Sequence, residues 1–453
     1  MLPARVPVER QQFVTQIRAR PYAYAAQQSM PLSHLPVWDG TSMQPQPTVL
    51  RAYVVATQDG YMVMPGGLTR VVSADRPVAS LQGDCGSKDT WVLSTRPIEP
   101  MSLLPPADQP IVLRRSGYAF PSRAADNLFW MGRYAERAEG VVRLLRSMMV
   151  RLADESKPGG GAAFAMLLRA LHATRDSVAP LGDAHDDDSV PTSYTQVLLP
   201  AMFDGALSNS VRTSLHNLHH VSALVRDYMT LESWRIVTQL IEHFTPFPGD
   251  GQIHIGAALD LLNHAIMILS AFSGLGSENM IRGPEWHFLD MGRRIERALH
   301  MTFLLQSTLV EINEQESSVL DALLEVGDSV ITYRTRYLTR LQCAPVLDLL
   351  LTDDTNPRAV IYQLVELASH VERLPHDRGM PSLTPAERFT LRMLTAVRLA
   401  QVDRLCQGDS SGRREQLDTL LRQLLMDLPA LSDTITHHYL SHAEPSRHLA
   451  QHT

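Results

Sequence analysis

Residues 131–138 read Met-Gly-Arg-Tyr-Ala-Glu-Arg-Ala, and residues 291–298 read Met-Gly-Arg-Arg-Ile-Glu-Arg-Ala. The two octapeptides are identical at six of eight positions, and their first residues are 160 positions apart. Internal similarity of this kind is typical of two copies of one structural unit. The repeat therefore predicts that two related segments, sharing Met, Gly, Arg, Glu, Arg and Ala, organise the fold.

Both copies lie early in predicted helices, because Ser122 is a preferred cap for the first and Pro284 a preferred first residue for the second. The apolar residues of each copy recur at helical spacing and predict a core-facing stripe. The stripes comprise Met131, Tyr134, Ala135, Ala138, Val142 and Leu145 in the first copy and Met291, Ile295, Ala298 and Leu305 in the second. The repeated charged residues are expected on the other side of each helix.

Gly132 and Gly292 each cost roughly 1 kcal/mol relative to alanine within a helix, so their repetition indicates a close helix approach. Two such helices, packed across a pseudo-twofold axis, would bring together six charged side chains. These are Arg133, Glu136, Arg137, Arg293, Glu296 and Arg297. Three interpretations stay open: a buried structural network, a site for a ligand or partner, or ion pairs that coincide on a solvated surface.

Composition narrows the class of protein. The 453 residues carry a net charge of -7 without a basic block, which argues against a dedicated nucleic-acid-binding protein. We find no signal peptide pattern and no uninterrupted apolar run near the roughly 20 residues that span a bilayer, so no membrane association is expected. Cys85, Cys343 and Cys406 form neither a disulfide framework nor a metal-ligand spacing, so a cytoplasmic location is expected.

The first 95 residues show the alternation of β-strands. Two apolar runs, 50–56 and 61–64, flank Thr57-Gln58-Asp59-Gly60, and Asp-Gly is a strong hairpin signal. Pro65-Gly66-Gly67 is expected to break the second strand, and a further strand is expected at 91–94. The sequence therefore predicts at least three strands in a small unit.

Prolines are frequent in residues 96–121, which predicts an extended linker. Beyond it, apolar residues recur at helical spacing through residues 122–440, which predicts eight to ten helices in a bundle-like domain. Residues 441–453 lack an apolar face and are expected to be a flexible tail. The predicted fold class is mainly α, with an internal pseudo-repeat, preceded by a small α+β or β-hairpin unit.

The helical region resembles the bacterial alpha-E domain, named for its Glu-Arg motif. The resemblance covers residues 115–440 and rests on the two Gly-Arg-x-x-Glu-Arg segments with Ser277-Glu278-Asn279, Trp286, Tyr333-Arg-Thr-Arg-Tyr337 and Asn356-Pro-Arg358. It adds Asn279, Arg334, Arg336 and Arg358 to the six repeated charges as a candidate polar site. The family resemblance also implies linkage to circularly permuted ATP-grasp proteins and to transglutaminase-like proteins as partners.

The first 95 residues resemble the C-terminal end of a circularly permuted ATP-grasp domain. The matching segments are Leu50 to Ala56, Asp59-Gly-Tyr61, Met64 to Arg70 and Ser87 to Val92, with Tyr24 to Gln28 resembling the adenine-contacting hinge. By this resemblance a nucleotide-binding remnant would comprise Gln28, Arg51, Arg70 and Lys88. The family usually carries Glu where this chain has Gln28.

An ATP-grasp ligase needs carboxylates that hold Mg²⁺ across the phosphates, and residues 1–95 offer no convincing set. ATP-grasp ligase activity is therefore not expected from this chain, and ATP with Mg²⁺ would bind only if a partner completed the fragment. We favour a relic or a truncated gene model for this segment, and the alternative is a piece that completes a partner.

Other patterns are weaker. His216, His219 and His220 share one helical face at a spacing that zinc tolerates, but polar helix faces often produce it, and no metal is expected. The chain contains no Glu-x-x-His pair and no P-loop. The favoured function is an auxiliary or scaffold protein of an ATP-grasp-linked system that forms peptide or amide bonds. The alternative is a helical enzyme in which Glu136 or Glu296 serves as acid or base toward an anionic or peptide substrate.

Overall fold

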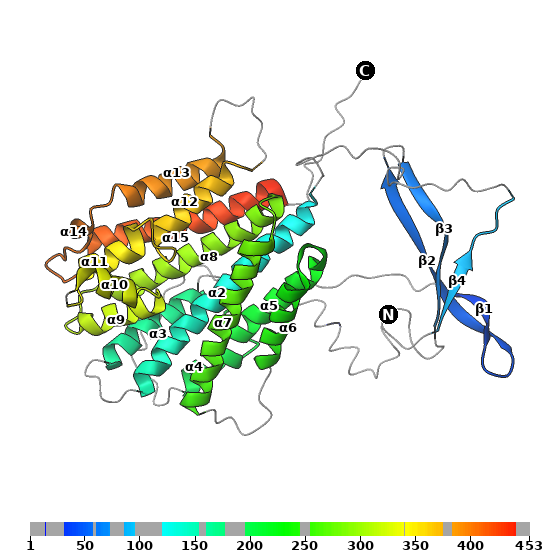
Figure 1. Cartoon of the computed structure of the whole chain (residues 1–453), viewed down its shortest axis with the longest axis horizontal. Coiled ribbons are helices and arrows are strands. Elements are labelled where there is room, and N and C mark those ends of the chain that lie inside the picture. The colour runs from blue at the N-terminus through cyan, green and yellow to red at the C-terminus, as the bar shows by residue number, and fades with distance from the viewer. Residues whose placement is uncertain are drawn as a thin grey trace, which may run out of the picture. The chain divides into compact units, whose positions relative to one another are not determined.

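The computed structural model of this chain describes residue 14 and residues 31–57, 60–72, 86–95, 120–153, 160–176, 195–244, 254–338, 340–374 and 383–440. The chain divides into two compact units, Met1–Arg114 and Arg115–Thr453 (Figure 1). Gln28, most of the proline-rich linker and residues 441–453 lie outside the described residues.

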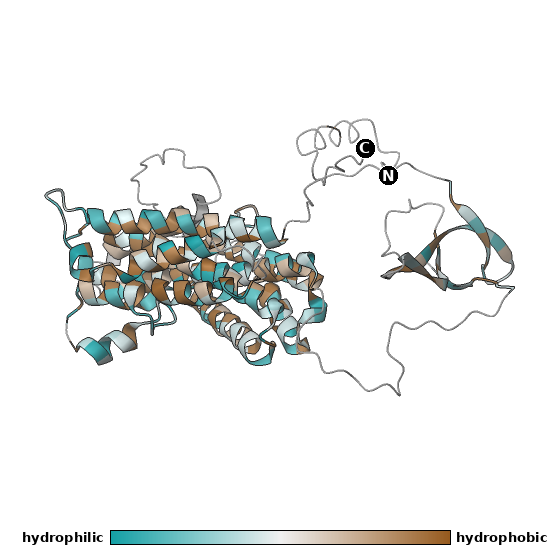
Figure 2. Ribbon diagram, turned by 90° about the horizontal axis from the view of Figure 1, so that it is seen from above, coloured by the Kyte–Doolittle hydropathy of each residue, from teal (hydrophilic) through white to brown (hydrophobic). Residues whose placement is uncertain are grey.

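The first unit contains a four-stranded antiparallel sheet in the order β1-β2-β3-β4. Its strands are β1 (Ser33–Trp38), β2 (Met43–Thr57), β3 (Gly60–Val71) and β4 (Ser87–Trp91). The expected hairpin is present, since Thr57 pairs with Gly60 at the end of β2 and β3. Figure 2 shows that the strands are strongly curved.

Two expectations about the strands were wrong. Pro65-Gly66-Gly67 does not end the second strand, because the register shifts between the pairs Ala52–Gly67 and Val54–Val63. The shift leaves residues 64–66 of β3 as a bulge opposite Tyr53 of β2. A proline is tolerated at such a bulge, since no ladder hydrogen bond is required there. The glycine is required by close packing: a Cβ on Gly67 would lie 2.6 Å from the carbonyl oxygen of Arg51.

The position of the last strand also differs from the prediction. It spans Ser87–Trp91 rather than residues 91–94, so the polar residues that precede Trp91 form the strand. They pair with β3 from Gly66 to Arg70. Backbone pairing with an existing strand therefore overrides the low strand preference of these side chains.

The second unit is built of fourteen α-helices within its described residues, more than the eight to ten expected, because several are short. They are α2 (Ser122–Ala153), α3 (Gly160–Asp176), α4 (Thr195–Phe203), α5 (Val211–Leu224), α6 (Leu231–His243), α7 (Ile255–Asn279), α8 (Pro284–Leu309), α9 (Glu316–Val326), α10 (Val330–Tyr337), α11 (Cys343–Leu347), α12 (Val360–Val371), α13 (Pro385–Arg398), α14 (Val402–Leu405) and α15 (Glu415–Ile435).

Helices α2 and α8 are the central pair of this unit. They make the most extensive contact between helices, while α3, α5 and α7 also pack on α2, and α12 and α15 also pack on α8 (Figure 1). Pro284 is the first residue of α8, as expected. Helix α2 begins at Ser122 itself, and the Pro121 carbonyl accepts hydrogen bonds from the backbone of Ala124 and Ala125.

The burial of α2 and α8 differs from the prediction of one buried stripe and one polar side. Met131, Ala135, Met291 and Ile295 are buried as expected. The repeated charges Arg133, Glu136, Arg293 and Glu296 are buried as well, because neighbouring helices cover more than one side of each helix. The apolar colour in Figure 2 accordingly lies mainly inside the helical unit, with hydrophilic colour on its outer surfaces.

Helix α7 has the length and composition of a membrane span, with a mean hydropathy of 1.6 in its most apolar window. The sequence had been expected to hold no uninterrupted apolar run near the length of a membrane span, and α7 is interrupted by Asp260, Asn263 and His264. Buried residues of α7, including Leu262, Leu269 and Phe272, belong to the core of the helical unit. Such a helix is weak support for membrane insertion, because core helices pass the same test.

Two cysteines that are distant in sequence are neighbours in the fold. Cys343 begins α11 and Cys406 follows α14, and their sulfur atoms lie 3.4 Å apart as free thiols. A separation of 63 residues concealed this proximity at the level of sequence.

Candidate functional site

The centre of the candidate site is the crossing of α2 and α8, where two glycines allow the backbones to touch. A Cβ built on Gly132 would lie 2.1 Å from the carbonyl oxygen of Leu289. One built on Gly292 would lie 2.1 Å from the carbonyl oxygen of Phe129. The contact is reciprocal, since each glycine meets the residue three positions before the other. Any side chain larger than hydrogen would force the helices apart.

Glu136 of α2 is held by two arginines of α8. Arg297 donates through Nε to Oε2 at 2.8 Å and through Nη2 to Oε1 at 2.6 Å, which is a bidentate contact. Arg293 donates through Nε to Oε1 at 3.0 Å.

Glu296 of α8 is held in the same way by two arginines of α2. Arg137 donates through Nε to Oε1 at 2.6 Å and through Nη2 to Oε2 at 3.2 Å. Arg133 donates through Nε to Oε2 at 2.5 Å. The six repeated charges therefore form two crossed clamps, each with one carboxylate and two guanidinium groups.

The charges in these clamps are mutually stabilised. Burial alone would raise the pKa of Glu296, but the charges of Arg133 and Arg137 outweigh it and hold that pKa well below its ordinary value. The pKa of Arg297 is raised in turn: burial lowers it, and the charge of Glu136 more than compensates. A carboxylate held in this way stays ionised and is a poor proton donor near neutral pH.

Further contacts fix the arginines. The guanidinium carbon of Arg133 lies 5.4 Å from the ring centroid of Trp130, and that of Arg137 lies 5.7 Å from the ring centroid of Tyr134. Arg133 also donates through Nη1 to the hydroxyl of Ser432 on α15, at 2.8 Å. The clamps therefore also connect the central pair to a third helix.

One side of the crossing carries additional charged residues. Glu139 accepts a hydrogen bond on Oε1 from Arg143 Nε at 2.8 Å and from Arg358 Nη2 at 2.7 Å. Arg297 Nη2 lies 3.8 Å from the other oxygen of Glu139. Arg358, which the family resemblance had added to the candidate site, therefore joins the network through Glu139.

The other predicted residues of the polar site do not join it. Asn279 is exposed at the end of α7 and Arg334 is exposed on α10. Arg336 forms an ion pair with Asp353. Asn356, which belongs to the same resemblance motif as Arg358 but not to the predicted site, donates through its amide to the carbonyl of Leu349 at 2.7 Å.

The sheet does not gather the predicted nucleotide-binding remnant on one face. Arg70 is paired with Val49 across β2 and β3, and Arg51 lies two residues further along β2, so both arginines lie on the same face. Lys88 is paired with Thr69, the neighbour of Arg70, and so lies on the opposite face. Lys88 donates to the carbonyl of Pro36.

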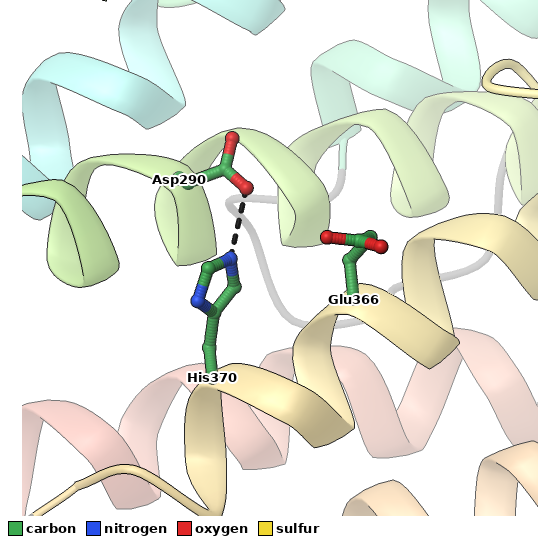
Figure 3. A group of neighbouring side chains, drawn as sticks. All are labelled: Asp290, Glu366 and His370. Carbon is green, nitrogen blue, oxygen red and sulfur yellow. Dashed lines mark hydrogen bonds and ion pairs between the residues drawn. The ribbon is translucent and has the colours of Figure 1, made fainter. Parts of the chain in front are cut away.

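A second polar cluster joins α8 to α12. Figure 3 shows Asp290 of α8 facing Glu366 and His370 of α12, and potential ligand atoms of all three lie within 4.8 Å of one another. Asp290 Oδ2 accepts from His370 Nε2 at 2.8 Å and from Arg294 Nε at 2.9 Å. Cationic and hydrogen-bonding groups already occupy this carboxylate, so the arrangement favours a polar connection between helices over a metal centre.

His287 extends this cluster. Its Nδ1 lies 2.9 Å from Nδ1 of His370, whose Nε2 contacts Asp290. Burial, followed by the imidazole of His370, lowers the pKa of His287 to about 4. The pKa of Asp290 is also lowered, to well below its ordinary range. Burial alone would raise it, but the hydrogen bond from His370 and the charges of Arg294 and Arg293 outweigh that effect.

Among the residues that the structure describes, the three histidines of α5 do not come close enough together to form a potential metal-binding group. Instead, the ring of His219 packs against Trp234, with their centroids 5.0 Å apart. Burial lowers the pKa of His219.

Several residues of these clusters were missed from the sequence. Glu139 and Arg143 follow the first octapeptide at a spacing of four, which is compatible with an ion pair on one helix face. Glu366 and His370 have the same spacing. These signals were available, but such pairs are common on solvated helices and do not by themselves indicate a site.

Comparison with known proteins gives two family matches. Residues 120–440 match the Alpha-E family, described as a predicted alpha-helical domain with a conserved ER motif. Residues 2–72 match circularly permuted ATP-grasp type 2. One chain therefore joins an Alpha-E domain to part of an ATP-grasp domain, which links it to an ATP-grasp system.

The similar curated proteins are uncharacterized. Proteins of Mycobacterium bovis and Mycobacterium tuberculosis are each 28% identical over 437 residues, which cover 93% of this chain and 48% of the relative. A Synechocystis protein is 43% identical over 95 residues, 20% of each chain. This chain thus spans about half the length of the mycobacterial relatives. No solved structure matches it.

Proposed function

The chain belongs to the Alpha-E family, and from this premise we propose that it is an auxiliary protein of an ATP-grasp system that forms peptide or amide bonds. In this proposal the first unit associates with a circularly permuted ATP-grasp protein, and the Alpha-E unit supports that protein's reaction. The observation that carries the proposal is the exposed apolar sheet of a unit that matches part of an ATP-grasp domain.

The sheet has almost no core of its own. Among its described residues only Thr48 and Thr69 are buried. Tyr61 and Val63 are 81% and 61% exposed, and they alternate along β3, so they lie on one face. Val54 is paired with Val63 and is also exposed there.

The opposite face is apolar too. Val55 is paired with Met62, and Val55 and Met64 are exposed. Strands that are apolar on both faces are typical of the interior of a larger domain, where both faces are covered. The proposed cover is the remainder of a circularly permuted ATP-grasp fold, because the family match of this segment is to that fold.

The helical unit is proposed to act through binding rather than through Glu296 as an acid or base. The motivation is that two arginines hold Glu296 ionised and buried. The transglutaminase-like partner implied by family resemblance stays a prediction.

Co-purification of the full chain with a circularly permuted ATP-grasp protein from the same organism tests the proposal. We expect Tyr61→Asp and Val63→Asp to reduce recovery of the complex at least about tenfold, because each places a charge on the surface that is to be buried. Ile331→Asp is the matched control, since Ile331 is 82% exposed on α10. Absence of a complex, or equal recovery with all three variants, would contradict the proposal.

Glu136→Ala and Glu296→Ala are less informative in that experiment. Both carboxylates are buried, so a loss of the complex after either substitution would report on the stability of the helical unit. The sheet variants separate association from folding, because they alter mostly exposed side chains that contribute little buried apolar surface to this chain alone.

A further inference from the structure

The two halves of the α2 and α8 crossing are unequal just beyond the octapeptides. At positions related by the offset of 160, Glu139 corresponds to Leu299, Gly140 to His300 and Arg143 to Phe303. The symmetry of the clamps is therefore broken on the side of Glu136. Charged groups accumulate there, and the equivalent positions of α8 carry a neutral or apolar side chain.

These charged groups leave an excess of positive charge. Glu136 and Glu139 together are contacted by Arg143, Arg293, Arg297 and Arg358. Arg293 also pairs with the buried carboxylate of Asp290, at 3.3 Å. The three other guanidinium groups, those of Arg143, Arg297 and Arg358, therefore share two carboxylates. Asp328, whose carboxylate lies 3.5 Å from Arg143 Nη1, is 65% exposed and offers only a weak, solvent-screened compensation.

The same residues line a cleft. It contains about 550 Å³ of empty space, including the part that opens to solvent. Its polar wall consists of Glu136, Arg143, Arg297, His300 and Arg358. Its apolar wall includes Leu144, Met301 and Leu304.

Two of the arginines have donors left for a ligand. Among the described residues, Arg143 Nη2 and Arg358 Nη1 donate to no acceptor. The surroundings also disfavour the charge on Arg358: burial, followed by the charge of Arg297, lowers its pKa despite the contact with Glu139. An anion in the cleft would relieve this repulsion and accept the remaining hydrogen bonds.

His300 adds no charge of its own at neutral pH, because burial lowers its pKa. It lies over Gly140, where a Cβ would approach within 2.6 Å of its Nδ1. The glycine therefore leaves room for the imidazole at the wall of the cleft.

We infer that this cleft binds one oxyanion, a carboxylate or a phosphate, with Arg143 and Arg358 as its hydrogen-bond donors. The apolar wall would accommodate a short aliphatic group attached to that anion. This inference rests on the helical unit alone and does not require the proposed association with an ATP-grasp protein.

Isothermal titration of the full chain with inorganic phosphate, n-butyrate and butyl phosphate tests the inference, with sodium chloride added to equal ionic strength. We expect saturable binding of one anion per chain. The relative affinity of butyrate and butyl phosphate would assign the anion as carboxylate or phosphate. Arg143→Gln and Arg358→Gln are expected to weaken binding about tenfold or more, since each removes a charge-assisted donor.

Arg336→Gln is the matched control, because Arg336 forms its ion pair with Asp353 and does not line the cleft. It should leave the affinity unchanged. Circular dichroism and thermal unfolding without anion establish that each variant is folded before titration.

Glu139→Gln guards against a loss of binding that reflects only misfolding. This substitution removes a competing carboxylate and leaves Arg143 and Arg358 without their shared counter-ion. We expect it to tighten anion binding about tenfold and to lower thermal stability in the absence of anion. No saturable binding of any probe, binding that both arginine variants leave unchanged, or weaker binding by Glu139→Gln would overturn the inference.

Discussion

Helices α2 and α8 share their centre and differ at their ends. At the centre, each glycine touches the other helix's backbone and each glutamate takes two arginines from the opposite helix. At the ends, Glu139 and Arg143 of α2 are matched by Leu299 and Phe303, and Asp290 of α8 is matched by Trp130. The shared centre fixes how the helices cross, whereas the unequal ends give each side a different chemical character.

This contrast separates two uses of the same residue types. The central arginines form reciprocal ion pairs with Glu136 and Glu296, so their main contribution is to stability. The peripheral arginines outnumber their carboxylates and border a cleft. The residues that the two copies share therefore determine how the helices pack. The positions at which the copies differ indicate where a ligand would bind.

The largest predicted effect concerns the central glutamates. Glu136→Ala and Glu296→Ala should each lower the free energy of unfolding by about 3–5 kcal/mol, because each leaves two buried or partly buried arginines without their shared carboxylate. Urea denaturation followed by circular dichroism measures this. The two losses should agree within about 1 kcal/mol; a clear inequality would show that the two clamps are not energetically equivalent.

The central glycines should come next. Gly132→Ala and Gly292→Ala are each expected to cost about 3 kcal/mol, because the new Cβ meets a backbone oxygen that belongs to the opposite helix. Gly274→Ala in α7 is the control, since no atom beyond the adjacent residues and the backbone of its own helix lies within 4 Å of its Cβ position. It should stabilise the protein by about 0.5–1 kcal/mol in the same denaturation experiment. A similar sign at all three positions would refute close packing as the reason for the central glycines.

A smaller effect distinguishes Gly140 from the central glycines. Gly140→Ala should cost about 1–2 kcal/mol, because its Cβ meets the His300 side chain and not a backbone atom. In a His300→Ala background the cost should vanish, whereas no single truncation can rescue Gly132→Ala. A double-mutant cycle by urea denaturation measures the coupling. An unchanged cost in the His300→Ala background would place the obstruction elsewhere.

The smallest effect is a pH dependence that α8 has and α2 lacks. The pKa of His287 is lowered to about 4 from its ordinary 6.5, and position 127 of α2 carries Asn. Since the unfolded chain binds this proton more readily, the contribution of His287 is complete above pH 6.5 and declines as the pH falls toward 4. Because His287 is only half-buried, we expect a loss of roughly 1 kcal/mol.

Thermal unfolding between pH 7 and pH 5 checks this prediction, since most carboxylates stay ionised in that interval. His287→Asn, which introduces the residue of the equivalent α2 position, should reduce the dependence. A remainder of the same sign is expected from His219 and His300, because burial also lowers their pKa values. His216→Asn replaces an exposed histidine of α5 and should leave the dependence intact. An identical slope in all three proteins would exclude His287 as its source.

Much of the fold was accessible from the sequence because it depends on local pattern. The helical period, Pro284 as the first residue of α8 and the hairpin at Asp59-Gly60 are short-range signals. The repeated glycine implied a close approach because its helical cost needs a compensating contact. Burial of the repeated charges could not be predicted, because it depends on other helices that are distant in sequence. The helices that pack around α2 and α8 are α3, α5, α7, α12 and α15.

The candidate site was predictable only where the two copies agree. Arg133, Glu136 and their equivalents could be assigned because both copies carry them. Arg358 is separated from Glu139 by 219 residues, so only family resemblance pointed to it, and the same resemblance also offered Arg334 and Asn279, which lie elsewhere. His300 carried no signal, since its role depends on the absence of a side chain at Gly140.

The reciprocal glycine contact has a consequence for how the two octapeptides can vary. From Gly132 to Glu136, and from Gly292 to Glu296, the chain advances four residues, slightly more than one helical turn. Inserting one residue in either interval would rotate that glutamate by about 100° away from its arginines while the glycine stayed in place. An insertion in one segment would therefore break its ion pairs with the other segment, unless the other segment carried a matching change.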